Sequence, residues 1–156
     1  MAEKTNAMRK LAAMKIAFTE HYYADTGAVA GADVARALGE DAARVFKTLV
    51  TVGKTGAHYV FLVPVEEELD LKKAAASVGE KSVEMLPVKD LLATTGYVRG
   101  GCSPIGMKKL FRTVIHQSAL EYGTIMFSGG RLGTQLKMNP NDLAKLINAE
   151  FADIIK

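Results

Sequence analysis

The sequence predicts a mixed α/β fold, in which a largely antiparallel or mixed sheet is surrounded by helices. Three observations lead to this fold class. Strand-like and helix-like apolar patterns are interspersed along all 156 residues, two strand-like segments are separated only by a short glycine turn, and neither a repeat nor a linker divides the chain. Residues 1–156 are therefore expected to form one domain around one core.

In the first half of the chain, capping residues and glycine turns mark the expected elements. The apolar, β-branched stretch 45–52 and the stretch 57–65 are expected to form a hairpin around Gly53 and Gly56. The elements expected before the hairpin are a helix capped by Thr5 and Asn6 with Met8, Leu11, Ala12 and Met14 on one side, a strand at 16–23, a loop between Gly27 and Gly31, and a helix at 33–38 closed by Gly39.

In the second half, the longest segment without a regular pattern is 96–106, which holds four glycines and a proline in eleven residues and is expected to be a loop. The elements expected around it are a helix from the Asp70 cap to Gly79, a strand at 82–86, a helix from Pro87 to Gly96, strands near 113–115, 124–127 and 134–138, and a final helix capped by Asn139 with Pro140 at its first position.

Composition narrows the possible functions. The formal net charge of +3 permits an RNA partner without requiring one, because affinity for a polyanion depends on clustering of the cations. The single cysteine excludes an intramolecular disulfide and a cysteine-based metal cluster, and the three histidines lack metal-ligand spacing, so neither metal nor cofactor is expected. No apolar run is long enough for a membrane span and residues 1–4 do not resemble a secretory signal, so we expect a cytoplasmic protein without a membrane partner.

Lys47 interrupts an apolar strand, where alternation places it on the same face as Val45 and Leu49. Such a lysine either points into a pocket or protects an exposed strand edge from pairing with another strand. Thr48 is expected on the opposite face unless the strand is bulged.

The loop 96–106 is a second candidate, because successive backbone amides in a glycine-rich loop can bind an oxyanion or a phosphate. Its spacing fits neither the dinucleotide fingerprint nor the nucleotide P-loop, so a plain structural turn is the alternative. Cys102 lies in this loop, but the sequence ties no histidine to it as a base, which favours a small buried filler over a nucleophile. Arg99 and Arg131 are either phosphate contacts or surface residues.

Several separated motifs resemble one known family. The chain reads KTNAMR at 4–9, RVFKTLV at 44–50, PV at 64–65, ELDLKK at 68–73, GYVRGG at 96–101, SP at 103–104 and SG at 128–129. In this order, these segments are similar to the YbaK family of aminoacyl-tRNA deacylases, and the similarity extends from about residue 4 to residue 147.

The resemblance implies a barrel-like mixed sheet and a pocket that includes the strand lysine and the glycine loop. By this correspondence Lys47 and Gly101 are the expected catalytic residues. The residues expected to bind the substrate are Thr48, Arg99, Gly100, Cys102, Ser103, Pro104, Ser128 and Gly129. Cys102 departs from the family pattern, in which an aliphatic or small residue is more usual.

The resemblance also implies a reaction: hydrolysis of Cys-tRNA(Pro) in trans, with Cys-tRNA(Cys) as a second candidate substrate. The substrate thiol attacks its own ester, so the chemistry is lyase-like if a thiolactone is released. The expected partners are the aminoacylated 3′ end of tRNA and prolyl-tRNA synthetase, and DNA is not expected. Two alternatives remain open, an Ala-tRNA(Pro) deacylase on the same scaffold and a non-catalytic module that binds tRNA or a nucleotide.

Overall fold

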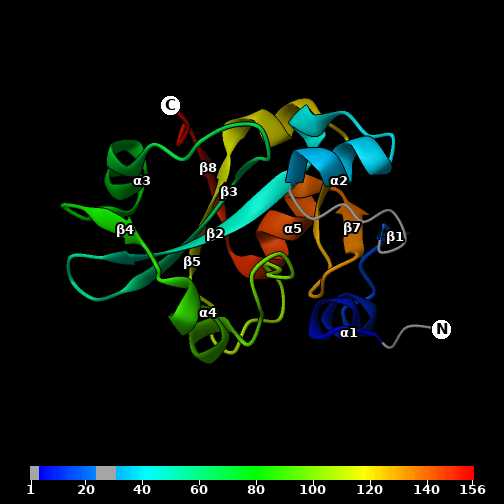
Figure 1. The fold of residues 1–156 in the computed structure, drawn as a ribbon, viewed down its shortest axis with the longest axis horizontal. Helices are drawn as coiled ribbons and strands as arrows, with labels where there is room; N and C mark the ends of the chain where they lie inside the picture. The colour runs from blue at the N-terminus through cyan, green and yellow to red at the C-terminus, as the bar shows by residue number, and fades with distance from the viewer. Residues whose placement is uncertain (1–3, 24–30) are drawn as a thin grey trace.

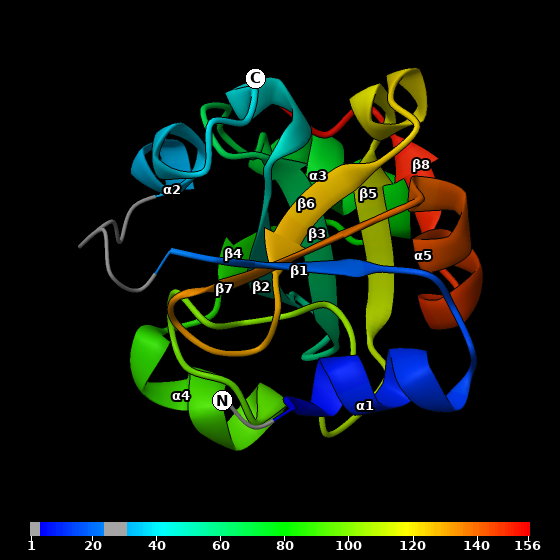
Figure 2. The ribbon, with the colours of Figure 1, turned by 90° about the vertical axis from the view of Figure 1, so that its right-hand side faces the viewer.

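Two β-sheets lie face to face, with helices around their ends and sides and one helix on the outer face of the larger sheet (Figures 1 and 2). The computed structural model describes residues 4–23 and 31–156. Within these residues the α-helices are α1 (Asn6–Ala13), α2 (Gly31–Ala37), α3 (Leu71–Val78), α4 (Val88–Thr95) and α5 (Pro140–Ile147), and short 3-10 helices lie at Ala42–Arg44 and Gln117–Glu121. The strands are β1 (Thr19–Tyr22), β2 (Phe46–Gly53), β3 (His58–Pro64), β4 (Val83–Met85), β5 (Arg112–His116), β6 (Ile125–Ser128), β7 (Thr134–Met138) and β8 (Glu150–Ala152).

The smaller sheet has the strand order β1-β7-β6 and is antiparallel, whereas the larger has the order β4-β2-β3-β5-β8. In the larger sheet β2 pairs antiparallel with β3 and β4, and the pairs β3–β5 and β5–β8 are parallel. A single parallel bridge, between Val45 and Met126, links the two sheets in the described part of the chain. The sheet class is therefore mixed, as expected, but the expected barrel-like sheet is two open sheets.

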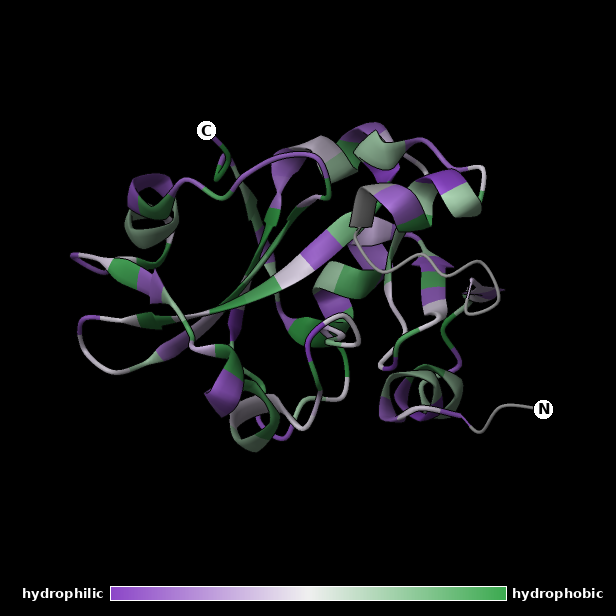
Figure 3. Ribbon diagram, in the orientation of Figure 1, coloured by the Kyte–Doolittle hydropathy of each residue, from purple (hydrophilic) through white to green (hydrophobic). Residues whose placement is uncertain are grey.

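The largest hydrophobic cluster lies between the two sheets. Figure 2 shows the smaller sheet in front of the larger one, with α1 and α4 at one end and α5 at one side. Phe127 and Leu136 from the smaller sheet join Phe46, Leu62 and Ile115 from the larger one in this cluster. A second cluster lies on the far face of the larger sheet, where α3 packs. Figure 3 shows hydrophobic colour along most of the central strands and a hydrophilic band in the first half of β2, the segment that carries Lys47.

The local signals placed most of these elements correctly. Thr5 caps α1 through a hydrogen bond to the Met8 amide, and Asp70 caps α3 through the amides of Lys72 and Lys73. Gly79 and Gly96 end their helices in the left-handed region, as expected for glycines at these positions.

Four details differ from the expectations. Met14 lies outside α1 with 60% of its surface exposed, β1 is shorter than the expected strand, and β8 was not anticipated. Pro87 is the N-cap of α4 instead of its first residue. The expected loop between Gly27 and Gly31 lies largely outside the described residues. No helix in the described residues is both long and apolar enough to span a membrane.

Candidate active site

Three polar side chains form a row across the smaller sheet. His21 in β1 is the cross-strand partner of Gln135 in β7, and Gln135 is in turn the partner of Ser128 in β6. Side chains of directly paired residues lie on the same face of a sheet. We call His21, Gln135 and Ser128 the polar row.

Lys47 extends this row onto the larger sheet. Val45 and Met126 form the bridge between the sheets and pack in one small cluster, so they lie on the same face. Lys47 lies two residues after Val45, Ser128 lies two residues after Met126, and the bridge is parallel. Because side chains alternate along a strand, Lys47 and Ser128 lie on that same face, each just beyond the bridge.

The surroundings of Lys47 combine features of a pocket lysine and of a lysine on an exposed strand edge. The side chain is half-buried, and its strand pairs with β3 on one side, but β4 pairs only from Thr51 onward. The backbone of Lys47 pairs with β3, but its ammonium group makes no hydrogen bond or ion pair with any described residue. The pKa of Glu68 lies below its ordinary value, first because Lys156 donates a hydrogen bond to it, with a smaller contribution from the charge of Lys47.

Two buried oxygen atoms near these residues lack a partner. Gln135 is 7% exposed, and its Oε1 atom accepts no hydrogen bond from the described residues. The same is true of the Thr48 hydroxyl, which is buried on the opposite face of β2 from Lys47. A buried polar atom without a partner costs about 1–3 kcal/mol. In a natural protein such an atom is satisfied by an ordered water or by a bound ligand.

The glycine-rich loop lies at the end of the polar row, against the turn that follows Ser128. A Cβ atom on Gly101 would lie 2.9 Å from Cα of Arg131, and a Cβ atom on Gly100 would lie 2.6 Å from Cδ2 of Leu132. Gly100 also has φ of +84°, a conformation that favours glycine. Both glycines therefore allow a close approach of the loop 100–104 to the turn 129–133.

The loop amides, expected as donors to an oxyanion, differ in the hydrogen bonds that they make within the protein. The Gly101 N–H already donates to the carbonyl of Val98 at 3.0 Å, inside the loop. By contrast, the amides of Gly100, Cys102 and Ser103 donate to none of the described residues. In this conformation the loop amides available to an oxyanion are those next to Gly101.

Interactions within the loop hold its shape. The Tyr97 hydroxyl donates to the carbonyl of Ile105 at 2.6 Å, and the Tyr97 amide donates to the Thr95 hydroxyl at 3.0 Å. The Ser103 hydroxyl is fully buried and accepts from the Ile105 amide at 3.3 Å. Ser103 is thus placed to support the loop, and Pro104 lines a separate small pocket.

Cys102 is buried in the core between the sheets, and burial raises the pKa of its thiol to about 11. A thiol with this pKa is protonated near neutral pH and is a poor nucleophile. We therefore expect Cys102→Ala to keep at least half of the wild-type rate in the reaction that the resemblance implies, deacylation of Cys-tRNA(Pro). Loss of turnover in a folded variant would contradict this interpretation.

The same pKa predicts a change in stability at alkaline pH. The folded protein binds the thiol proton more tightly than the unfolded chain does. The protonated thiol therefore contributes fully to the free energy of unfolding below pH 9, and this contribution is lost as the pH rises toward 11. Denaturant unfolding at pH 8 and pH 10.5 is expected to show a larger loss of stability for wild type than for Cys102→Ala. An equal loss would show that other groups account for the alkaline effect.

The remaining expected residues have different surroundings. Arg99 is exposed, and no described residue bonds to it. Ser128 is 9% exposed, and its hydroxyl accepts from the Gly130 amide at 3.3 Å. Gly129 donates to Thr134 and accepts from the Thr5 hydroxyl, so both of its backbone groups are used. Arg131 donates to the Thr134 hydroxyl at 3.3 Å.

The structure thus brings Lys47 and Ser128 onto one face, with Gly100 and Gly101 at its end. It places Thr48 on the other face of β2 and Pro104 in another pocket. Sequence reasoning missed Gln135 and left His21 without a role. The available signal for Gln135 was the alternation of polar and apolar residues in the segment TQLKM. Its pairing with Ser128 depends on the register between β6 and β7, which this local pattern does not determine.

Residues 26–146 match the family model of the aminoacyl-tRNA editing domain. The chain therefore belongs to this family, as the motifs of the sequence indicated. It is 46% identical over 153 residues to EbsC of Enterococcus faecalis, which is named as a candidate Cys-tRNA(Pro)/Cys-tRNA(Cys) deacylase. This alignment covers 97% of the present chain and 93% of EbsC.

Two further similarities involve prolyl-tRNA synthetase. The chain is 26% identical over 123 residues to the proline–tRNA ligase of Thermosipho melanesiensis, covering 79% of this chain but 21% of the ligase. The crystal structure of a candidate trans-editing enzyme for prolyl-tRNA synthetase is 26% identical and has a TM-score of 0.83, with 99% of both chains covered.

Proposed function

We propose that the protein is a trans-editing deacylase that removes cysteine from Cys-tRNA(Pro), with Cys-tRNA(Cys) as a second substrate. Its family and the name of its relative EbsC support this reaction class. The observation that carries the proposal is the unpartnered Oε1 atom of Gln135, buried beside Ser128 on the face that Lys47 shares. This site can receive a small group that carries both a hydrogen-bond donor and an acceptor.

An aminoacyl ester has that chemistry. Its α-ammonium group donates hydrogen bonds, which the Oε1 atom of Gln135 can accept, and its carbonyl oxygen can accept from the ammonium of Lys47. As negative charge develops on the carbonyl oxygen, Lys47 and the free amides of the loop stabilise it. These roles for Lys47, Gln135 and the loop are part of the proposal.

The substrate supplies its own nucleophile in this mechanism. The cysteine sulfur of the substrate attacks the ester carbonyl carbon and forms a carbon–sulfur bond. The bond to the ribose oxygen then breaks, that oxygen takes up the thiol proton, and a thiolactone leaves. The buried, protonated Cys102 is consistent with a site that contributes no thiolate of its own.

Editing in trans gives the reaction a biological reason. A synthetase pocket built for proline rejects a residue of similar size by only about 10- to 200-fold, so a second site that hydrolyses the wrong product is needed. We further propose that prolyl-tRNA synthetase is the partner from which the charged tRNA is taken. The cytoplasm, where tRNA is charged, is the corresponding compartment.

Gln135→Leu tests the observation that carries the proposal. We expect KM for Cys-tRNA(Pro) to rise at least tenfold, because a hydrogen bond to a charged group contributes about 1.5–3 kcal/mol. We expect little loss of stability, because the Oε1 atom has no partner to lose. The matched control is Gln117→Leu, at an exposed position beyond β5. Wild-type kinetics in Gln135→Leu would remove the proposed contact.

A further inference from the structure

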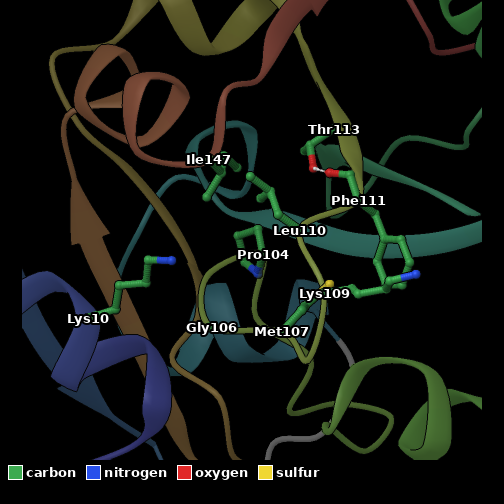
Figure 4. A pocket seen from close by; sticks show the side chains of 9 residues that line it. All are labelled: Lys10, Pro104, Gly106, Met107, Lys109, Leu110, Phe111, Thr113 and Ile147. Atoms are coloured by element: carbon green, nitrogen blue, oxygen red, sulfur yellow. Dashed lines mark hydrogen bonds between the residues drawn. The ribbon is translucent and has the colours of Figure 1, made fainter.

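A small pocket, of about 50 Å³, lies apart from the polar row, between α1, the end of the glycine-rich loop, β5 and α5 (Figure 4). None of the proposed chemistry uses it. Pro104, Phe111 and Ile147 supply apolar walls, and Lys10 and Lys109 supply two cations from distant parts of the chain. Figure 4 shows Lys10 extending from α1 toward Pro104, and Lys109 running beside Phe111.

The two lysines that line this pocket have no acidic partner among the described residues. Neither Lys10 nor Lys109 has a hydrogen bond or ion pair from its ammonium group to any described residue. The elements that form the pocket, at 6–13, 104–113 and 140–147, carry one acidic residue, Asp142. Their basic residues are Arg9, Lys10, Lys108, Lys109, Arg112 and Lys145, of which Arg112 forms an ion pair with Glu150 at 3.0 Å. The cations are therefore concentrated here, although the whole chain has a net charge of only +3.

The size of the pocket limits what can enter it. One water molecule needs roughly 10–15 Å³, so a cavity of about 50 Å³ has room for a compact group such as one phosphate and not for a nucleotide. The Lys10 ammonium beside an apolar wall suits a phosphodiester, whose charge is singly negative and whose esterified atoms are less polar. The Lys109 ammonium points away from Lys10, past Phe111, so it is placed for a neighbouring phosphate (Figure 4).

The pocket shares its loop with the candidate active site. Gly101 faces the turn after Ser128, and Pro104, three residues later, lines the pocket. Three residues of extended chain span at most about 11 Å. The pocket wall at Pro104 therefore lies within about 11 Å of Gly101, a span comparable to one or two nucleotides of an extended strand.

We propose that this pocket binds a backbone phosphate of the tRNA whose 3′ end enters the candidate active site, with Lys10 as the binding cation and Lys109 contacting an adjacent phosphate. This inference rests on the proposed function and adds an RNA contact outside the reacting centre. Each lysine neutralises phosphate charge, so each contributes to the salt dependence of binding.

The test measures binding of uncharged tRNA(Pro) at several salt concentrations. We expect Lys10→Ala and Lys109→Ala each to weaken binding about threefold to tenfold and to reduce the slope of log K against log salt by about 0.7–0.9. The matched control is Lys72→Ala, an exposed lysine of α3 at the opposite side of the molecule (Figure 1). All three positions are exposed, so the substitutions are expected to leave the fold intact.

Kinetics separate this contact from the chemistry. With Cys-tRNA(Pro) as substrate, Lys10→Ala is expected to raise KM and leave kcat unchanged. With cysteine esterified to adenosine alone, which has no backbone phosphate, both KM and kcat are expected to stay at wild-type values. If wild type hydrolyses neither ester, the proposed function fails, while the binding slopes still decide whether the pocket contacts RNA.

Two results would overturn the inference. In the first, the salt slopes of Lys10→Ala and Lys109→Ala equal those of wild type and Lys72→Ala. In the second, inorganic phosphate at millimolar concentration raises the melting temperature of wild type but not of Lys10→Ala, while RNA binding is unchanged by the substitution. The second result would make the pocket a site for a free anion.

Discussion

Replacing Lys47 with alanine is expected to lower kcat/KM for Cys-tRNA(Pro) by roughly 100- to 1000-fold, the usual effect of removing one preorganised donor from a developing oxyanion. Lys47 lies on the same face as Ser128, and no described residue binds its ammonium group. The donor is therefore available to a substrate. Initial rates of deacylation over a range of tRNA concentrations would measure the effect.

Three comparisons make the Lys47 result specific. Lys47→Arg keeps the charge but changes the geometry, so we expect partial activity. Lys54→Ala removes an exposed lysine from the β2–β3 turn and is expected to behave as wild type. Thermal unfolding of Lys47→Ala checks that the half-buried position still folds. A folded Lys47→Ala variant with full activity would show that the lysine only protects the strand edge.

Gly101→Ala is expected to destabilise the protein by about 1–3 kcal/mol and to reduce deacylation sharply. The new Cβ atom would lie 2.9 Å from Cα of Arg131 and 3.0 Å from two further backbone atoms of the turn 129–133. Because backbone atoms cannot move aside as a flexible side chain can, the loop and the turn must separate. Urea unfolding and deacylation of Cys-tRNA(Pro) would measure the two effects.

Gly123→Ala is the matched control, because a Cβ atom there has no neighbour within 4 Å and its φ is not positive. We expect it to keep the activity and to be neutral or slightly stabilising, since alanine restricts the unfolded chain. If Gly101→Ala were as stable and as active as Gly123→Ala, the close approach of loop and turn would have no importance.

Local signals in the sequence predicted most of the fold. Thr5, Asp70 and Asn139 were recognised as caps because the reason for a cap lies within a few residues of it, and the structure shows the corresponding hydrogen bonds. The hairpin of β2 and β3 was equally local, since Gly53 and Gly56 form its turn. The β8 strand was missed because it has three residues and is defined by parallel pairing with β5, far away in sequence.

The candidate site was harder to predict because it depends on register between distant strands. The motifs identified Lys47, the loop and Ser128 separately, but only the bridge between Val45 and Met126 places the lysine and the serine on one face. Gln135 belongs to none of the recognised sequence motifs, and its lack of a hydrogen-bond partner at Oε1 can be seen only in the folded structure. The hydrogen bond from the Gly101 amide to the Val98 carbonyl likewise depends on the loop conformation, which the amino-acid composition of the loop does not reveal.

The central claim, editing of cysteine by the thiol of the substrate, is tested most directly by hydrolysis of Cys-tRNA(Pro) and Ala-tRNA(Pro) by the wild-type protein, measured side by side. We predict rapid loss of cysteine, with a thiolactone as the first product, and little loss of alanine, which has no thiol to attack its ester. Equal or faster loss of alanine would contradict the claim, because water would then have to be the nucleophile.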